Sequence, residues 1–176
     1  MKGIVFTEFL EMVEETFGYD MVDTLNETTE LKSGGVYTAV GTYDHSEIVN
    51  LVVNLSKQTN TDIDILLHAF GRYIFDTFVK SYPVFFDNCS SSFEFLESID
   101  NYIHVEVLKL YPDATLPRFT TEINDGKMSM IYISERSMSA LAHGLIEKTV
   151  EYYSEDMPIQ KETMAEDGSK VRFVIG

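Results

Sequence analysis

Residues 102–112 read YIHVEVLKLYP and lie in an apolar run that begins at Phe93. Apolar residues recur in this run at intervals of three and four, which predicts one helix from Phe93 to Tyr111 with a buried face. The residues of that face are Leu96, Ile99, Ile103, Val107 and Leu110. His104 lies at the edge of the face. It is either a core histidine bonded to a carbonyl or a ligand of a metal or cofactor, and the stretch leaves both open.

A second group of polar side chains follows in the sequence YISER at residues 132–136. Residues two apart share one face of an extended segment, so Tyr132, Ser134 and Arg136 point the same way. Two hydroxyls and a guanidinium suit a carboxylate, because Arg binds it through two parallel charge-assisted bonds. The alternative is a solvent-facing strand edge in which Ser134 caps the next helix.

Apolar residues at helical spacing predict four helices before this run. The first expected helix ends at Gly18, and the second covers Tyr19–Leu31. The third runs from Asp44 to Lys57, and the fourth runs from Thr61 or Asp62 to just before Pro83. Asp44 and Glu47 have the spacing of a capping box. Between the helices we expect a short extended segment at Val36–Thr42 and a loop at Phe85–Ser92, with Ser92 as a cap of the next helix.

After Pro112 the pattern changes to alternation. It predicts two hairpins and one helix: strands at Arg118–Ile123 and Lys127–Ser134, a helix at Ser137–Tyr153, and strands at Met157–Met164 and Ser169–Ile175. We therefore expect an α+β fold in one domain, residues 1–176. A helical part, about 1–112, packs on a part of about 113–176 that holds a four-stranded antiparallel sheet with one further helix.

The composition argues against several classes of partner. The formal net charge of -16 opposes binding to nucleic acids and to anionic membrane surfaces. No apolar run is long enough to span a bilayer, and the acidic N-terminal segment is not a signal peptide, so we expect a cytoplasmic protein. The single Cys89 excludes an internal disulfide and a thiolate zinc site. His45 and His68 are expected to be exposed or packing histidines.

The order of these features resembles the haem nitric oxide/oxygen-binding family, H-NOX, whose sensor domain is shared with soluble guanylate cyclase. The features are His104 within IHVEV, Pro117 within TLPR, and the complete Tyr-x-Ser-x-Arg of residues 132–136. The stretches MKG at 1–3, GR at 71–72 and GLIE at 144–147 are also similar to that family. The resemblance extends over essentially all 176 residues.

The resemblance implies a haem b cofactor between the helical part and the sheet. His104 would be the axial ligand of the iron, Tyr132, Ser134 and Arg136 would bind the propionates, and Pro117 would press on the porphyrin and bend it. The rest of the pocket would consist of apolar residues, namely Val5, Phe9, Ile74, Phe78, Leu141 and Leu145.

The chain departs from oxygen-binding relatives in this pocket. Leu141 stands where they carry a distal tyrosine, Ile74 where they carry another polar residue, and Phe9 where they carry an indole. Tyr73, His143 or a water molecule are the alternative hydrogen-bond donors. Some relatives hold structural zinc through Cys and His in the C-terminal half, where this chain has no Cys, so we expect no zinc.

The resemblance implies a gas sensor for nitric oxide, and also carbon monoxide, that is not an enzyme. It would signal through haem-coupled conformational change to a separate partner, a histidine kinase or a cyclic-dinucleotide enzyme. We expect a monomer. The alternative function is an oxygen-binding haem protein or a haem enzyme that uses the same pocket.

Overall fold

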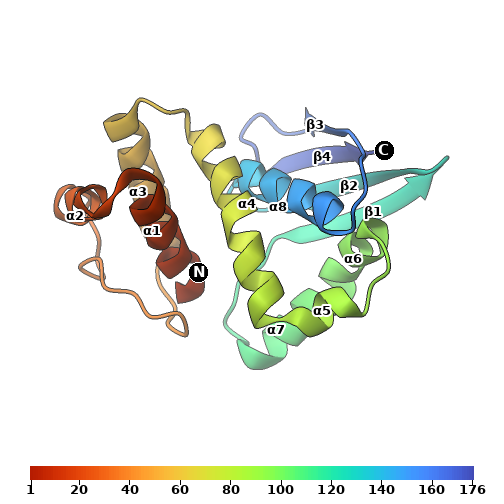
Figure 1. Ribbon diagram of the computed structural model, residues 1–176, viewed down its shortest axis with the longest axis horizontal. Helices are drawn as coiled ribbons and strands as arrows, with labels where there is room; N and C mark the ends of the chain where they lie inside the picture. Colours follow the sequence, from red (N-terminus) through yellow and green to blue (C-terminus); the bar gives the residue numbers. More distant parts are fainter.

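The protein has helices at one end, a sheet at the other, and the long helix α4 between them (Figure 1). The computed structural model describes residues 1–176. The first four helices are α1 (Gly3–Phe17), α2 (Tyr19–Thr28), α3 (His45–Thr59) and α4 (Ile63–Ser81). They are followed by α5 (Pro83–Asp87), α6 (Ser92–Ser98), a π-helical turn (Ile99–Ile103) and α7 (His104–Leu110). The C-terminal part contains β1 (Arg118–Asn124), β2 (Lys127–Ile133), α8 (Ser139–Tyr152), β3 (Ile159–Thr163) and β4 (Lys170–Ile175).

The ends of the N-terminal helices follow from local chemistry. Gly18 ends α1 with a φ of 87°, a conformation that favours glycine. Asp44 begins α3 by accepting a hydrogen bond from Ser46 N, and Asp62 begins α4 in the same way. The predicted capping box at Asp44 is wrong, because the carboxylate of Glu47 accepts hydrogen bonds from Ser33 Oγ at 2.5 Å and from the Tyr37 hydroxyl at 2.8 Å.

The segment 36–42 does not form the extended strand that its composition predicts. Only an isolated bridge joins Lys2 to Thr42. The segment instead covers the start of α1, where Gly3 N donates to Gly41 O at 2.8 Å and Ile4 N donates to Ala39 O at 2.9 Å. The first N–H groups of a helix have no partner within the helix, and these carbonyls satisfy two of them.

The sheet confirms the predicted four-stranded antiparallel arrangement, with strand order β1-β2-β4-β3. Asp125 and Gly126 both have positive φ, as a two-residue hairpin turn between β1 and β2 requires. Alternate residues of β2 and β4, such as Met130 and Phe173, are buried on one face together with Ile146 and Val150 of α8. In Figure 1, α8 lies across this face of the sheet.

Helices α4 and α8 approach each other very closely. A Cβ atom added to Gly71 would lie 2.2 Å from Leu141 O, and one added to Gly144 would lie 2.2 Å from His68 O. No side chain fits at either position with this backbone separation. The helix pair joins the two ends of the molecule, because α4 packs both in the core of the N-terminal helices, through Phe70 and Ile74, and in the core of the sheet, through Phe75.

The helix predicted at Phe93–Tyr111 is interrupted. The π-helical turn separates α6 from α7, and His104 is the first residue of α7. Such turns insert an extra residue and shift the faces of a helix. The predicted buried face is confirmed at Leu96, which is buried, and at Ile99 and Ile103, which pack against the core, but it is wrong at Leu110, which is 68% exposed.

The segment before this helix also differs from the expected loop. Pro83–Asp87 form α5, whose Phe86 is buried. The cap of α6 is Ser91, whose hydroxyl accepts from Glu94 N, and not Ser92. Ser92 is buried and donates to the Glu155 carboxylate, which ties α6 to the segment after α8. None of the helices is long and apolar enough to cross a membrane.

Candidate functional site

A cavity of about 300 Å³ lies where α1, α4 and α8 face the π-helical turn, α7 and β2. Twenty of its 29 lining residues are hydrophobic, which is typical of a site for a small molecule or cofactor. Ten of the eleven site residues predicted from the sequence line it: Val5, Ile74, Phe78, His104, Pro117, Tyr132, Ser134, Arg136, Leu141 and Leu145.

His104 stands in one wall of this cavity, with 17% of its side chain exposed. Its Nδ1 is buried without a hydrogen-bond partner and lies 3.7 Å from Asp100 Oδ1. Burial lowers the pKa of His104, and the Asp100 carboxylate offsets this only in part. The neutral form is therefore favoured, and a neutral imidazole is the form that binds a metal.

Asp100 is itself held in place by the first strand of the sheet. Its carboxylate accepts hydrogen bonds from Phe119 N and from Arg118 Nε, both at 3.2 Å. The π-helical turn carries Asp100 and lies directly before His104. This arrangement places a fixed carboxylate beside the histidine ring, the kind of group that orients histidine ligands.

The Tyr-x-Ser-x-Arg side chains lie together at the end of β2. Tyr132 is 3% exposed, and its hydroxyl accepts a hydrogen bond from Met138 N at 3.0 Å. Ser134 Oγ accepts from Arg136 N at 3.2 Å. The guanidinium of Arg136 is half-buried, and burial lowers its pKa without any carboxylate nearby to oppose this. In a chain with more than twice as many acidic as basic residues, an unpaired cation at an apolar cavity is a site for an anionic group.

The wall opposite His104 is apolar. It is formed by Val5 of α1, Ile74 and Phe78 of α4, and Leu141 and Leu145 of α8. Thr149 is the one residue of α8 in the lining that carries a hydroxyl, and this hydroxyl donates a hydrogen bond to Leu145 O at 2.8 Å. This wall therefore presents no free side-chain hydrogen-bond donor.

Three residues considered from the sequence do not line the cavity. Phe9 is fully buried behind the wall, where its ring packs on Phe70 with centroids 5.3 Å apart. Tyr73 faces the acidic residues of α1, and burial together with Glu11 and Glu15 raises its pKa to about 12. His143 belongs to a separate polar cluster. The candidate donors Tyr73 and His143 are therefore both outside the cavity.

The structure adds lining residues that were not predicted as site residues. The loop before β1 contributes Asp113, Ala114, Thr115 and Leu116, and the start of α1 contributes Met1 and Lys2. The orienting carboxylate Asp100 was also missed. Its position four residues before His104 was the available signal, but the π-helical turn that directs it could not be seen in the pattern.

Comparison with known proteins agrees with this geometry. The profile of the haem-NO-binding (HNOB) family matches residues 2–161. This chain belongs to the haem-NO-binding family. The family consists of haem-binding gas-sensor domains, also called H-NOX, and not of enzymes. The fold and the family expected from the sequence are both confirmed.

Solved H-NOX structures resemble the protein over its whole length. The unliganded Fe(II) H-NOX protein from K. algicida is 45% identical, with 100% of this chain and 96% of that chain covered and a TM-score of 0.96. The H-NOX from Shewanella woodyi, solved in the Fe(II)CO state, is 40% identical, with 99% and 93% covered and a TM-score of 0.83. The S. oneidensis H-NOX protein in the Fe(II)NO state shares the fold at 24% identity, with 100% and 98% covered and a TM-score of 0.90. No curated protein sequence matches the chain.

Proposed function

We propose that this H-NOX domain binds haem b in the cavity and senses nitric oxide. His104 would hold the iron through Nε2, because its Nδ1 faces Asp100. Tyr132, Ser134 and Arg136, which line the cavity, would bind the propionates, and Pro117 would press on the porphyrin. Haem would supply an iron that can bind a diatomic gas.

One observation carries this proposal. One apolar cavity contains both a largely buried histidine, whose neutral form is favoured, and an arginine without a carboxylate partner. Haem requires this combination, because it offers an iron, an apolar ring and two carboxylates. An ordinary core would leave neither an unsatisfied Nδ1 nor an unpaired guanidinium beside apolar side chains.

The apolar wall supports nitric oxide as the ligand. Oxygen bound to haem depends on a hydrogen-bond donor, whereas nitric oxide and carbon monoxide depend on one much less. Leu141 and Ile74 offer no donor, and Thr149 donates to its own helix. The CO state of the S. woodyi relative and the NO state of the S. oneidensis relative are consistent with these gases.

The signal would reach a separate protein, a histidine kinase or a cyclic-dinucleotide enzyme, as the family resemblance implies. Val5 of α1 and Pro117 of the loop before β1 line the same cavity. A ligand shifts an equilibrium only through its different affinity for two states, so gas binding must favour one packing of these two residues. Helix α1 is therefore the element expected to move.

Absorption spectroscopy of the purified ferrous protein tests the proposal. We expect a Soret band with one haem per chain, a spectral change with nitric oxide and with carbon monoxide, and none with air. Hydrogen exchange of residues 3–17 should differ between the free and nitric oxide forms. A colourless protein with normal folding contradicts the haem assignment. A stable spectral change in air favours the alternative of an oxygen-binding protein or haem enzyme.

A further inference from the structure

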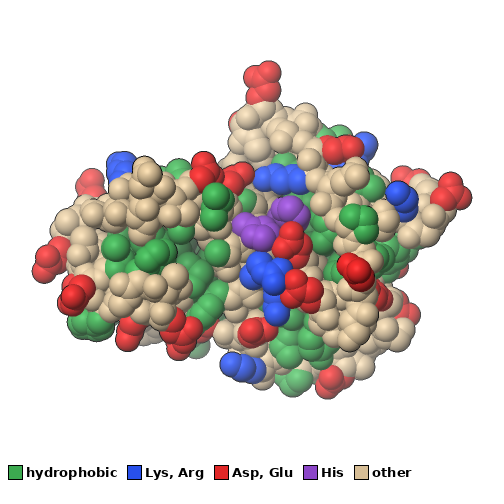
Figure 2. Space-filling view, turned by 45° about the horizontal axis from the view of Figure 1, so that its top comes forward, with side chains coloured by type: hydrophobic (Ala, Val, Ile, Leu, Met, Phe, Trp, Pro, Cys, Tyr) green, Lys and Arg blue, Asp and Glu red, His purple; other side chains and the backbone are tan.

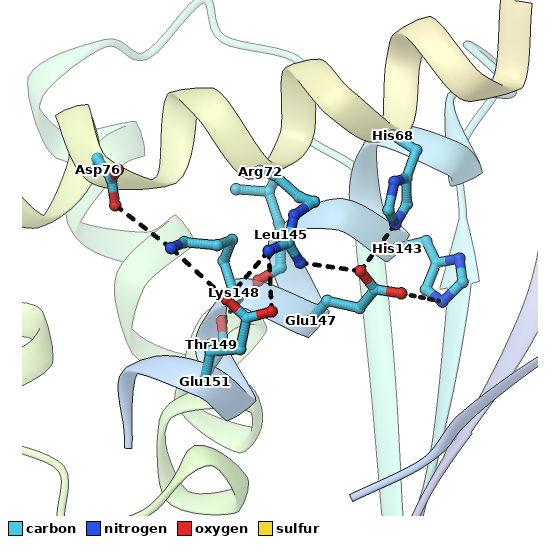
Figure 3. Close-up of polar contacts among 9 residues, drawn as sticks. All are labelled: His68, Arg72, Asp76, His143, Leu145, Glu147, Lys148, Thr149 and Glu151. Atoms are coloured by element: carbon cyan, nitrogen blue, oxygen red, sulfur yellow. Dashed lines mark hydrogen bonds and ion pairs between the residues drawn. The ribbon is translucent and has the colours of Figure 1, made fainter. Parts of the chain in front are cut away.

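Helices α4 and α8 carry a compact group of polar side chains on the face turned away from the cavity. Figure 2 shows histidine side chains gathered in the middle of one surface, bordered by basic and acidic side chains. The close-up in Figure 3 shows that His68 comes from α4, whereas His143 and Glu147 come from α8, and that both histidines point toward the Glu147 carboxylate.

The three side chains have the spacing of metal ligands. His68 Nε2 lies 2.9 Å from Glu147 Oε2, and His143 Nε2 lies 3.4 Å from Glu147 Oε1. One ligand atom from each residue lies within 4.8 Å of the other two. Bonds of about 2.0–2.2 Å to a tetrahedral zinc ion place neighbouring ligand atoms about 3.3–3.6 Å apart. The distance of 3.4 Å from His143 lies in this range, whereas the 2.9 Å from His68 is shorter, so His68 must rotate away from the carboxylate to admit an ion.

The environment of the three groups favours an ion between them. His143 Nε2 is buried and has no hydrogen-bond partner, although polar atoms in a protein interior nearly always have one. Each of the three side chains is 22–30% exposed, so an ion can enter from solvent. Arg72 Nη1 donates to Glu147 Oε2 at 3.0 Å, which fixes the carboxylate and leaves Oε1 available. Such outer hydrogen bonds are typical of metal ligands.

We propose that His68, His143 and Glu147 bind one zinc ion, with water as the fourth ligand. Two imidazoles and a carboxylate are ligands that zinc accepts, whereas magnesium prefers oxygen ligands alone. The expectation of no zinc rested on the lack of Cys in the C-terminal half. This site needs no thiolate, and it depends on His68 from the helical half.

The ion would join α4 to α8 beside their closest contact. Gly144 meets the backbone of His68 at this crossing, and the other face of the same helix pair forms the apolar wall of the cavity. A ligand that binds only the folded state raises its stability by an amount that grows with the logarithm of the ratio of ligand concentration to dissociation constant. Zinc is therefore expected to raise the Tm without occupying the gas site.

Untagged, haem-loaded full-length protein provides the test. After treatment with a chelator and gel filtration, the protein is incubated with zinc chloride, and zinc and iron per chain are measured by mass spectrometry. Competition with a chromophoric chelator gives the dissociation constant. We expect one zinc per chain and no binding of magnesium. His68→Gln, His143→Gln and Glu147→Gln should each weaken zinc binding at least about 10- to 100-fold, the range found for groups that only support a ligand.

His45→Gln is the matched control, because His45 lies on α3 beside Asp44 and outside the cluster. This variant should bind zinc, and zinc should raise its Tm as much as that of the unaltered protein. Circular dichroism identifies any variant that fails to fold, and the two remaining ligand variants then decide. The proposal is overturned if the protein retains no zinc, or if every folded ligand variant binds zinc as His45→Gln does. Zinc content is measured without gas, so this outcome is separate from the test of nitric oxide sensing.

Discussion

The two walls of the cavity are built in different ways. The His104 wall carries polar groups among its apolar residues, and behind it Asp100 is fixed by Phe119 N and Arg118 Nε. The opposite wall consists of apolar faces of α4 and α8, held by backbone contact at glycines. The difference indicates that the two walls have different functions. Under the proposed function, the polar wall would determine whether haem binds, and the apolar wall would determine which gas binds to it.

The largest effect is expected where the polar wall loses its ligand. His104→Gly should lower haem retention by more than about 100-fold, since loss of groups that only support a ligand costs about 10- to 100-fold. The small residue leaves space beside Asp100 for free imidazole. Haem dissociation is measured by transfer to a high-affinity haem acceptor, with and without imidazole.

His45→Gly is a suitable control for this variant, because His45 is half-exposed and does not line the cavity. It should retain haem as the unaltered protein does. If His104→Gly keeps the original ferrous spectrum in the absence of imidazole, another residue holds the iron and the two walls do not divide the work as described.

The sequence predicted the polar side chains of the cavity better than the residues that hold them in place. Tyr132, Ser134 and Arg136 were found because period-2 alternation and side-chain chemistry are both local. Asp100 was missed because a π-helical turn moves it into place, and apolar spacing carries no sign of such a turn. Phe9 was placed in the lining from family resemblance, yet it is buried one layer behind. The depth at which Phe9 lies depends on how α1 packs on Phe70, and no single stretch of sequence specifies this packing.

A smaller effect is expected at the anionic end of the polar wall. Arg136→Ala should lower haem retention about 10- to 150-fold, because a hydrogen bond to a charged group contributes about 1.5–3 kcal/mol. Arg136→Lys should restore only part of the loss, since an ammonium group cannot form two parallel bonds. The same haem-transfer assay measures both variants.

Arg118→Ala tests whether haem retention depends on the position of Arg136 or only on positive charge near the cavity. Arg118 is basic and close to His104, but it pairs with Asp100 instead of standing unpaired. Its loss should change haem retention less than the loss of Arg136. Equal dissociation rates in Arg136→Ala and the unaltered protein would mean that Tyr132 and Ser134 hold the propionates without it.

Prediction of the apolar wall from the sequence had a different limit. Ile74, Phe78, Leu141 and Leu145 line the cavity, and the family resemblance, not the sequence pattern, had implied them there. The polar cluster on the back of the same helices was not foreseen. His68 and His143 are far apart in sequence, and only the glycine contact between α4 and α8 brings them to Glu147.

The smallest expected effect is a gain of oxygen binding at the apolar wall. Leu141→Tyr introduces a phenolic hydroxyl on α8, in the apolar wall, where the side chains of α4 and α8 offer no free donor. A neutral hydrogen bond contributes about 0.5–1.5 kcal/mol, so oxygen affinity should rise about 2- to 13-fold. Leu141→Phe adds nearly the same volume without the hydroxyl, and it should leave oxygen affinity unchanged. Oxygen titration of both ferrous variants therefore separates the donor from the ring. If Leu141→Phe gains as much as Leu141→Tyr, the shape of the apolar wall and not its lack of a donor determines which gas binds.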